Sequence, residues 1–542
     1  MDDAPQHRET PALLSVNLYL LVGLLVLVWG SSLPETGVRY VVGMAVECGL
    51  ALGALLFMRF ERLSIRETLR WRWPGWQSLV LSGGVVFGLW LVSILLNLMT
   101  TAVFGYTTPL SPSMFPRNAP EAFLLILSTV VVAPLCEEIM FRGYVQRAYE
   151  RRRPWIGIAV SGVIFALYHL RFQGAFALMP VAFALGFVAW RSNSLFPGML
   201  LHAAYNSIAT AVIIASSFFP MPVVGGLVMA LICMGMLLSP VALVALWGFW
   251  RVTHPPARAV QPRLTGWRTW AWIAPLIVMF GIYSYAAYME VLVGRFPEKL
   301  AVDALTFETP AAWDMPARWQ YVIRGGINQT VGTATCELTP QSDSVELACQ
   351  VQQDAFEADL PFNLPADFDA LTLPGLSLAG EAFESNQRVI WAKADLALRA
   401  LSGTRETGDS ALTLIAGDAD KVLRVECANA TETAALPPGT LLDGEWPWRL
   451  SALPFALTYG STQPLALVSN EGRIRIVDAF VIVEGGEPAW TPAGNFVTWK
   501  VAVSYEIDGE ETTLTAWYDV DAPHTLVRYD NGEVNYLLEK VQ

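Results

Sequence analysis

The chain has 542 residues, of which 54% are hydrophobic and 15% are charged, and its formal net charge is −13. Residues 1–294 carry 19 arginines, no lysine and 12 acidic residues, whereas residues 295–542 carry 16 basic and 36 acidic residues. A net charge of +7 followed by one of −20 excludes a uniform soluble domain and predicts a membrane module joined to an acidic soluble domain. The acidic half is not expected to favour nucleic acid or anionic lipid as a partner, because it would repel their phosphates.

Nine apolar runs in the first half approach the roughly 20 residues needed to cross a bilayer. They lie near residues 13–33, 38–58, 78–100, 121–141, 155–171, 174–190, 196–217, 223–250 and 269–291. The fifth and sixth runs are short, which predicts tilted, bent or partly re-entrant segments. The first run is longer than the apolar part of a signal peptide, so we expect it to be retained as a span.

The arginines predict the orientation of these spans. If the N-terminus is cytoplasmic, 16 of the 19 arginines fall in inner loops, and only Arg39, Arg117 and Arg171 fall in outer loops. This distribution follows the positive-inside rule and predicts a multi-pass protein of the cell membrane. Nine spans place the C-terminal domain outside the cytoplasm. Three prolines in residues 254–263 predict a cytoplasmic linker before a final tethering helix.

The second half has the alternating pattern of β-strands from about residue 315. Residues 474–483 and 496–505 are examples, and Asp508-Gly509 is a typical hairpin turn. The pattern predicts a mostly antiparallel domain, as one large curved sheet or a sandwich. Cys336 and Cys349 flank a predicted hairpin, and the sequence is compatible with either a disulfide or two free thiols. This domain shows no catalytic constellation, and its ligand is unknown.

Two adjacent glutamates, Glu137 and Glu138, interrupt the fourth apolar run. A carboxylate in hydrocarbon costs on the order of 2.5–3.5 kcal/mol, so the pair indicates a functional site. Glu138 and Arg142 are four residues apart and share a helix face, which predicts an ion pair. Glu137 lies about 100° around the helix and remains available for other chemistry. Pro134, one turn earlier, is expected to disturb the helix, whereas Glu47, in the second span, is expected to be structural or to face a pore.

Two further polar pairs occur at helical spacing, Phe165 with His169 and His202 with Asn206. Together with the glutamates they predict a hydrolase. Glu137 would act as a general base toward a water held with His169, and His202 and Asn206 would stabilise a tetrahedral oxyanion. Alternatively, Glu137, His169 and His202 would hold a divalent metal such as zinc, whose bound water attacks. The sequence leaves both mechanisms open.

At these residues the chain resembles the CAAX protease and bacteriocin-processing (CPBP) family of intramembrane endopeptidases, which includes the prenyl-protein proteases. The motifs of that family stand here in order as Glu137-Glu138-x-x-x-Arg142, Phe165-x-x-x-His169 and His202-x-x-x-Asn206. The resemblance covers about residues 75–250. It implies that Glu137 is the base, that His169 helps to activate water, and that His202 and Asn206 donate to the oxyanion. It leaves the substrate and the β domain open.

The sequence therefore predicts a polytopic α-helical membrane domain, with about eight core helices plus one tethering helix, followed by a mostly antiparallel β domain outside the cytoplasm. The expected parts are N-terminal helices with an arginine-rich loop (1–74), a protease core (75–250), a linker with the final helix (251–294) and an acidic β-rich domain (295–542). Simple up-and-down counting places His169 and His202 far from mid-depth, so their meeting with Glu137 requires long tilted helices or incomplete spans.

The predicted function is hydrolysis of a peptide bond in a membrane-associated protein or peptide. The candidate catalytic residues are Glu137, Glu138, Arg142, His169, His202 and Asn206. One alternative is a non-catalytic scaffold or immunity-type factor that acts through its β domain. A transporter is a third alternative, although the sequence contains neither an inverted repeat nor a second acidic cluster.

Overall fold

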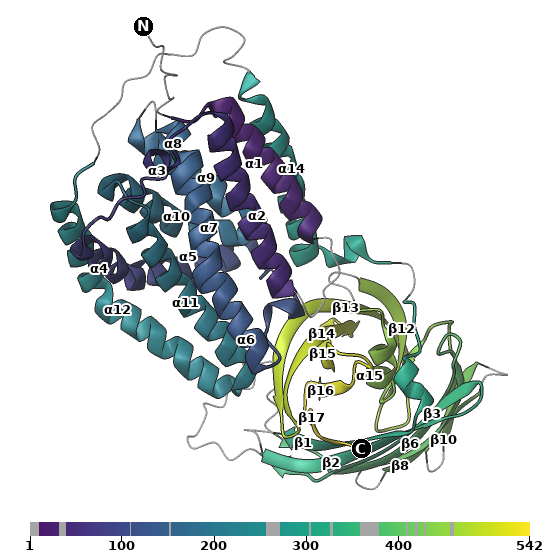
Figure 1. Ribbon diagram of the computed structural model, residues 1–542. Coiled ribbons are helices and arrows are strands. Elements are labelled where there is room, and N and C mark those ends of the chain that lie inside the picture. Colours follow the sequence, from purple (N-terminus) through teal and green to yellow (C-terminus); the bar gives the residue numbers. More distant parts are fainter. Residues whose placement is uncertain are drawn as a thin grey trace, which may run out of the picture. The chain divides into compact units, whose positions relative to one another are not determined.

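The computed structural model of the chain describes residues 10–31, 39–108, 110–150, 153–255, 271–302, 305–325, 329–357, 379–407, 410–417, 421–427, 430–455 and 460–542. The chain forms two compact units. One, which is helical, comprises residues 1–108, 116–216 and 221–295, and the other, which is rich in β-structure, comprises residues 109–115, 217–220 and 296–542 (Figure 1). The predicted linker at 254–263 lies almost wholly outside the described residues.

Every predicted apolar run forms a helix. The helices are α1 (Leu13–Ser31), α2 (Arg39–Phe60), α3 (Ile65–Thr68), α4 (Trp76–Gly84), α5 (Val86–Phe104), α6 (Ala119–Ile126), α7 (Ala133–Glu137), α8 (Gln146–Tyr149), α9 (Pro154–Tyr168), α10 (Phe172–Ser192), α11 (Phe196–Phe218), α12 (Met221–Val252) and α14 (Ala274–Arg295). Eight helical segments among the described residues are long and apolar enough to span a membrane. The fifth run is the shorter helix α9, of 15 residues, as the sequence predicted. The prediction was wrong for the sixth run, which forms the 21-residue helix α10 and is long enough to span a membrane.

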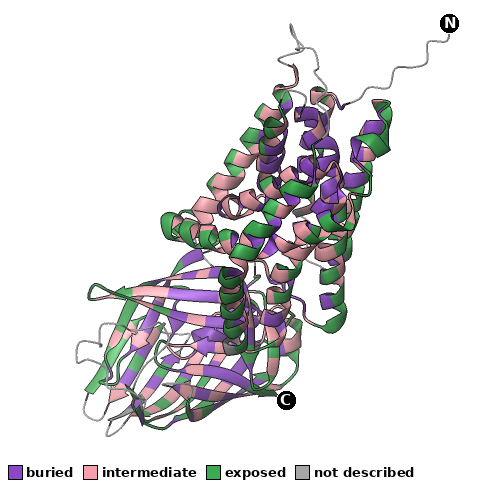
Figure 2. Cartoon of the chain, turned by 90° about the vertical axis from the view of Figure 1, so that its left-hand side faces the viewer, coloured by how far each residue is buried: buried purple, intermediate pink, exposed green. Residues whose placement is uncertain are grey.

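The outward surfaces of these helices are apolar. Val103, Leu237 and Phe280 are each more than 70% exposed, and Figure 2 marks such exposed positions along the helices. Exposure of large apolar side chains on this scale suits contact with lipid, because a hydrocarbon surrounding removes its cost. The chain is therefore a multi-pass integral membrane protein.

The helix that carries the glutamates is irregular where they lie. Between α6 and α7 the chain adopts a π-helix at Leu127–Val132, and a second π-helix, Glu138–Val145, leads from α7 to α8. Pro134 lies in the first turn of α7, directly after the first π-helix. A proline has no N–H to donate, so the predicted disturbance of the helix occurs there. π-Helical turns inside α-helices often occur at functional sites.

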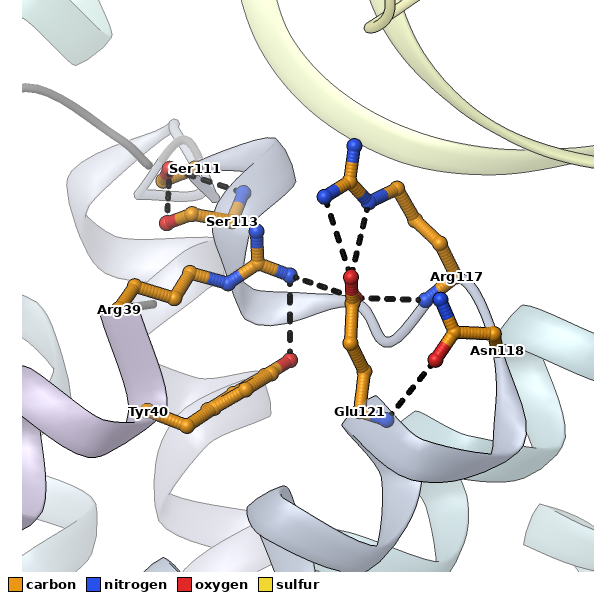
Figure 3. A network of polar contacts seen from close by, with 7 residues as sticks. All are labelled: Arg39, Tyr40, Ser111, Ser113, Arg117, Asn118 and Glu121. Atoms are coloured by element: carbon orange, nitrogen blue, oxygen red, sulfur yellow. Dashed lines mark hydrogen bonds and ion pairs between the residues drawn. The ribbon is translucent and has the colours of Figure 1, made fainter. Parts of the chain in front are cut away.

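A polar network fastens the start of α2 to the start of α6 (Figure 3). The side chain of Asn118 caps α6 by accepting a hydrogen bond from the Glu121 N–H at 2.9 Å. The Glu121 carboxylate accepts from Arg117 Nη2 at 3.1 Å and from Arg39 Nη2 at 3.4 Å. Two of the three arginines predicted to lie in outer loops therefore have a structural role, which is to join two helices through one carboxylate.

The second unit contains one 15-stranded sheet, in the order β10-β9-β8-β7-β6-β3-β2-β1-β17-β16-β15-β14-β13-β12-β11, and a separate pair, β4 and β5. Its strands are β1 (Ala317–Gly325), β2 (Gln329–Pro340), β3 (Ser344–Gln353), β4 (Phe356–Glu357), β5 (Ala379–Gly380), β6 (Phe383–Ala392), β7 (Leu398–Thr407), β8 (Ser410–Gly417), β9 (Val422–Cys427), β10 (Ala430–Ala435), β11 (Leu441–Leu442), β12 (Gly460–Val468), β13 (Ile474–Thr491), β14 (Gly494–Ile507), β15 (Glu510–Asp519), β16 (Leu526–Asp530) and β17 (Asn535–Val541). Neighbouring strands of the large sheet are antiparallel except β11 and β12, which are parallel. The predicted fold class is therefore confirmed.

The sheet curls around the short helix α15 (Trp446–Arg449), as Figure 1 shows. The Trp391 indole donates to Glu445 Oε1 at 2.7 Å, and the Tyr518 hydroxyl donates to the Pro447 carbonyl at 2.6 Å. These bonds anchor the helix to the inside of the sheet. Burial raises the pKa of the Glu445 carboxyl group above its usual value.

One local prediction for this unit is met, and one question that the sequence left open is answered. Asp508 and Gly509 both have positive φ, 54° and 88°, which is the conformation of a two-residue hairpin turn between β14 and β15. Cys336 and Cys349 face each other directly across β2 and β3 and are joined by a disulfide.

Candidate active site

The centre of the helical unit contains a buried ion pair. Arg142 Nη1 donates to Glu138 Oε1 at 2.9 Å, Arg142 Nη2 donates to the Ala182 carbonyl at 3.1 Å, and the guanidinium lies 4.3 Å from the centre of the Phe165 ring. Both charged side chains are at most 1% exposed. This is the pair that the four-residue spacing predicted, and it connects the second π-helix to α9 and α10.

His202, on α11, lies between the two glutamates. Its Nδ1 is 3.2 Å from Glu138 Oε1, and its Nε2 is 3.7 Å from Glu137 Oε2. The first distance is a hydrogen bond, and the second is too long for one. Gly198, one turn earlier, permits the close approach, because a Cβ at that position would lie 2.9 Å from Glu138 Oε2. The glycine thus fixes how near α11 comes to the glutamates.

His169 ends α9 and turns toward the same centre. Its Nδ1 lies 3.0 Å from the Phe165 carbonyl oxygen. A carbonyl can only accept, so we assign the ring hydrogen to Nδ1, which leaves Nε2 as an acceptor. Leu170 then adopts a left-handed conformation, with φ 53°, before α10 begins at Phe172. The short α9 and this tight turn account for the position of His169 that simple counting of spans made difficult.

Glu137 and His169 line one cavity of about 320 Å³. Its walls are formed by Leu27, Glu47, Leu50, Glu137, Met140, Phe141, Tyr168, His169 and Leu170. Glu137 Oε2 is buried and has no hydrogen-bond partner among the described residues. A buried polar atom without a partner is costly, which indicates that this oxygen is kept for a ligand or a water.

Asn206 has a different immediate partner. Its Nδ2 donates to the Thr129 carbonyl at 2.8 Å, and so ties α11 to the first π-helix. The Thr129 hydroxyl in turn lies 2.8 Å from that of Thr210. An amide nitrogen carries two hydrogens, so one donor of Asn206 is still available after this bond. Neither Asn206 nor His202 is among the described residues that line the 320 Å³ cavity.

The residues considered as metal ligands do not form a metal site. Within the described parts of the chain, no three His, Cys, Asp or Glu side chains are arranged to hold a metal ion. Glu137, His169 and His202 are brought near one another, and His202 Nδ1 is engaged by Glu138, but the three side chains are not arranged as ligands of one ion. We therefore derive no step through a metal.

Glu47, on α2, which the sequence predicted to be structural or to face a pore, lies in this cavity. It lines the cavity beside Glu137 and His169, and its Oε2 is also buried without a hydrogen-bond partner among the described residues. A carboxylate within an apolar span was the available signal. Without a motif around it, the sequence did not show that Glu47 faces the glutamates of another helix.

The β unit contains a second cavity, of about 950 Å³. Its lining combines aromatic side chains, among them Tyr505, Tyr529 and Tyr536, with polar ones such as Gln353 and Arg405. Arg405 is already paired with Asp443 at 3.1 Å. The cavity gives the β unit a place for a ligand, but its mixed lining does not define the chemistry of that ligand.

A polytopic helical unit with a buried centre of carboxylate, imidazole and amide groups has the architecture of an intramembrane hydrolase. Comparison with known proteins supports this class. Residues 119–208, which contain all three motifs, match the family of type II CAAX prenyl endopeptidases described as Rce1-like. The resemblance inferred from the motifs is therefore confirmed for this segment.

Two curated relatives match over a similar length. An uncharacterized 24.3 kDa protein of Escherichia coli is 28% identical over 93 residues, which are 16% of this chain and 42% of the relative. The UPF0177 protein YbdI of Lactococcus lactis subsp. lactis (strain IL1403) is 31% identical over 88 residues, which are 16% of this chain and 47% of the relative. The chain thus spans less than half the length of these relatives.

Among solved structures, the chain is similar to a beta-barrel-like protein of a domain of unknown function from Brucella abortus. The alignment covers 45% of this chain and 99% of that protein, with 13% sequence identity and a TM-score of 0.27.

Proposed function

We propose that this protein is an intramembrane endopeptidase that hydrolyses a peptide bond of a membrane-associated protein or peptide. The observation that carries the proposal is the buried Oε2 of Glu137, which has no hydrogen-bond partner in the described parts of the chain and lies in the cavity that His169 also lines. The family match of residues 119–208 supports the same activity at the level of the family.

In the proposed reaction, Glu137 and His169 hold the attacking water between them. The unprotonated Nε2 of His169 accepts one hydrogen of the water, and Glu137 removes the other as the oxygen attacks the peptide carbonyl. The carbonyl oxygen then becomes negatively charged. Asn206, through its remaining N–H, and His202 are the proposed donors to that charge.

Glu138 and Arg142 act by positioning in this proposal. Glu138 accepts from His202 Nδ1 at 3.2 Å and from Arg142 at 2.9 Å, so it fixes the orientation of the imidazole ring. Both residues are buried and already engaged with protein groups. They therefore hold the site together without touching the substrate.

We propose further that the protein lies in the cell membrane, with a cytoplasmic N-terminus and residues 295–542 outside the cytoplasm. The arginine distribution supports this orientation. The Cys336–Cys349 disulfide supports it independently, because disulfides persist in oxidising compartments. In this arrangement residues 75–250 form the protease core, residues 1–74 and 251–294 flank it with further helices, and the β domain presents its cavity to an unknown ligand.

The test uses the full-length protein in liposomes with membrane-anchored, quenched fluorescent peptides, some ending in a prenylated CAAX sequence and some in an acylated one. Glu137→Gln keeps the size of the side chain but removes the base, so cleavage is expected to fall by a factor of about 100 to 10,000. Glu67→Gln is the matched control, because Glu67 is 57% exposed in a surface ion pair. It should cleave at the wild-type rate.

The same assay separates the alternatives. Full cleavage by the Glu137→Gln protein would show that the assigned base is wrong. Binding of peptides or partner proteins without cleavage by the wild-type protein would favour a scaffold that acts through the β unit. Solute flux without cleavage would favour a transporter.

A further inference from the structure

We propose that Glu47 is a second catalytic carboxyl group, which shares one proton with Glu137 and gives it to the amine that leaves. This inference rests on the proposed peptidase function and adds a residue that lies outside the three motifs. It assigns α2, in the N-terminal part of the chain, a direct part in the chemistry.

The first observation is the position of Glu47. It lines the 320 Å³ cavity together with Glu137 and His169, and each glutamate has a buried Oε2 without a hydrogen-bond partner among the described residues. Two carboxyl groups that face one small cavity cannot both be ionised without a large repulsion, so they share a proton. One of them then serves as base while the other serves as acid.

The second observation is the set of titratable groups around Glu47. Tyr19 on α1, Cys136 and Glu137 on α7, and Tyr168 at the end of α9 all interact electrostatically with it. Tyr19 and Tyr168 are themselves bound to backbone carbonyls, those of Leu50 and Leu20. The two hydroxyl groups are thus committed as donors elsewhere.

His169 completes the group of residues around the cavity. The guanidinium of Arg142, which interacts with Glu137, is hydrogen-bonded to Glu138 and to the Ala182 carbonyl. The groups identified around Glu47 therefore consist of hydroxyls, a thiol, a carboxyl and an imidazole. In such surroundings a proton is the simplest means of neutralising one of the two carboxyl groups.

The third observation is that α2 is held against the helix that carries Glu137. At one end of α2, Arg39 bonds Glu121 of α6 at 3.4 Å (Figure 3). Near the middle, α2 packs against α7, where Cys48 and Cys136 interact, and each cysteine is the sequence neighbour of one of the two glutamates. Two separate contacts therefore fix the register that brings Glu47 to Glu137.

The proposed step balances in protons and bonds. Water loses a proton to Glu137, and its oxygen forms a bond to the carbonyl carbon, whose C=O electron pair moves to the oxygen. The electron pair on the oxyanion then re-forms the C=O bond as the C–N bond breaks. The electron pair of the C–N bond stays on nitrogen, and nitrogen takes the proton of Glu47. The proton on Glu137 then passes to Glu47, which restores the starting state with one water consumed.

The test compares Glu47→Gln with the wild-type protein in the liposome assay. The glutamine keeps the shape and can donate a hydrogen bond, but it cannot transfer a proton. We expect kcat to fall by a factor of about 100 or more with KM nearly unchanged. We also expect the bell-shaped pH dependence of kcat/KM to lose its alkaline limb, a change that a purely structural role would not produce.

A fold control uses the native thiols. Dibromobimane becomes fluorescent when it bridges two neighbouring thiols, so it reports the pairing of Cys48 with Cys136 without any turnover. The signal should persist in Glu47→Gln and disappear in Cys48→Ser. If Glu47→Gln does not fold, infrared spectroscopy of the wild-type protein decides the question. A protonated carboxyl band that shifts in Glu137→Gln supports the shared proton, and its absence overturns it.

The assay distinguishes failure of the proposed role of Glu47 from failure of the proposed peptidase function. If Glu137→Gln is inactive while Glu47→Gln has the wild-type kcat and pH profile, the role of Glu47 is refuted and the peptidase assignment stands. If Glu47→Gln folds and is slower but keeps both limbs of the pH profile, Glu47 is structural and the proposal is again refuted. If the wild-type protein cleaves no peptide, both proposals fail.

Discussion

Replacement of Arg142 by methionine tests how the site is held together. Methionine has a similar length and no charge, so the change removes two hydrogen bonds, one to Glu138 at 2.9 Å and one to the Ala182 carbonyl at 3.1 Å. It also removes the contact of the guanidinium with the Phe165 ring at 4.3 Å. Glu138, which is 0% exposed, would keep only His202 as a partner.

The expected cost follows from this burial. Removing one member of a buried ion pair leaves the other charge without compensation and typically destabilises a protein by about 3–5 kcal/mol. Adding Glu138→Gln removes that charge. Because buried pairs replaced by neutral groups are often no less stable than the originals, we expect the double variant to recover most of the loss, to within about 1–2 kcal/mol of the wild-type protein.

The measurement is equilibrium unfolding of the full-length protein in mixed micelles. Arg72→Met is the control, because Arg72 and Glu67 form an exposed ion pair whose loss should cost at most about 1 kcal/mol. The reasoning would be refuted if Arg142→Met unfolded like this control, or if the double variant were no more stable than the single one. Both Arg142 variants should cleave poorly, since Glu138 no longer fixes His202 as before.

Two further predictions concern other parts of the chain. Gly198→Ala would place a Cβ 2.9 Å from Glu138 Oε2, so we expect it to destabilise the protein by about 1–3 kcal/mol and to slow cleavage. Gly281→Ala is the control: a Cβ at Gly281 would meet open space, so this variant should change neither stability nor cleavage. Burial raises the pKa of Glu445, so the folded state favours its protonated form. The β unit should therefore lose stability as the pH rises from the usual range of a glutamate through the raised pKa. In thermal unfolding of the full chain, Glu445→Gln should make the unfolding temperature less dependent on pH. If the unfolding temperatures of the wild-type protein and the variant depended equally on pH, the prediction would be contradicted.

The fold was largely predictable because its determinants are local. Each of the nine apolar runs forms helical structure among the described residues, and the Asp508-Gly509 turn forms the hairpin between β14 and β15. The Glu138–Arg142 ion pair was likewise accessible from the sequence, since a spacing of four residues places both side chains on one helix face. The sequence predicted a disturbed helix at Pro134 and offered a curved sheet as one of two alternatives. It did not predict the π-helices on both sides of α7 or the packing of the sheet around α15, because these depend on contacts between distant residues.

The candidate site was predictable only in part. The sequence predicted that Glu137, His169 and His202 belong to one site, and the structure places them around one centre. The sequence did not show that Asn206 donates a hydrogen bond to the Thr129 carbonyl, because this contact depends on the packing of α11 against the first π-helix.

By itself, the sequence determined which segments form apolar helices, which half carries the β domain, and which side chains are too polar to lie in lipid without a function. Only the tertiary structure decided which of those side chains face one another, with Glu47 beside Glu137 as the clearest case. The physical reason is that lipid and protein interior are both apolar. The lipid-facing and protein-facing sides of a membrane helix therefore differ little in hydrophobicity, so its sequence does not show which side faces the protein. Packing between helices determines that side instead.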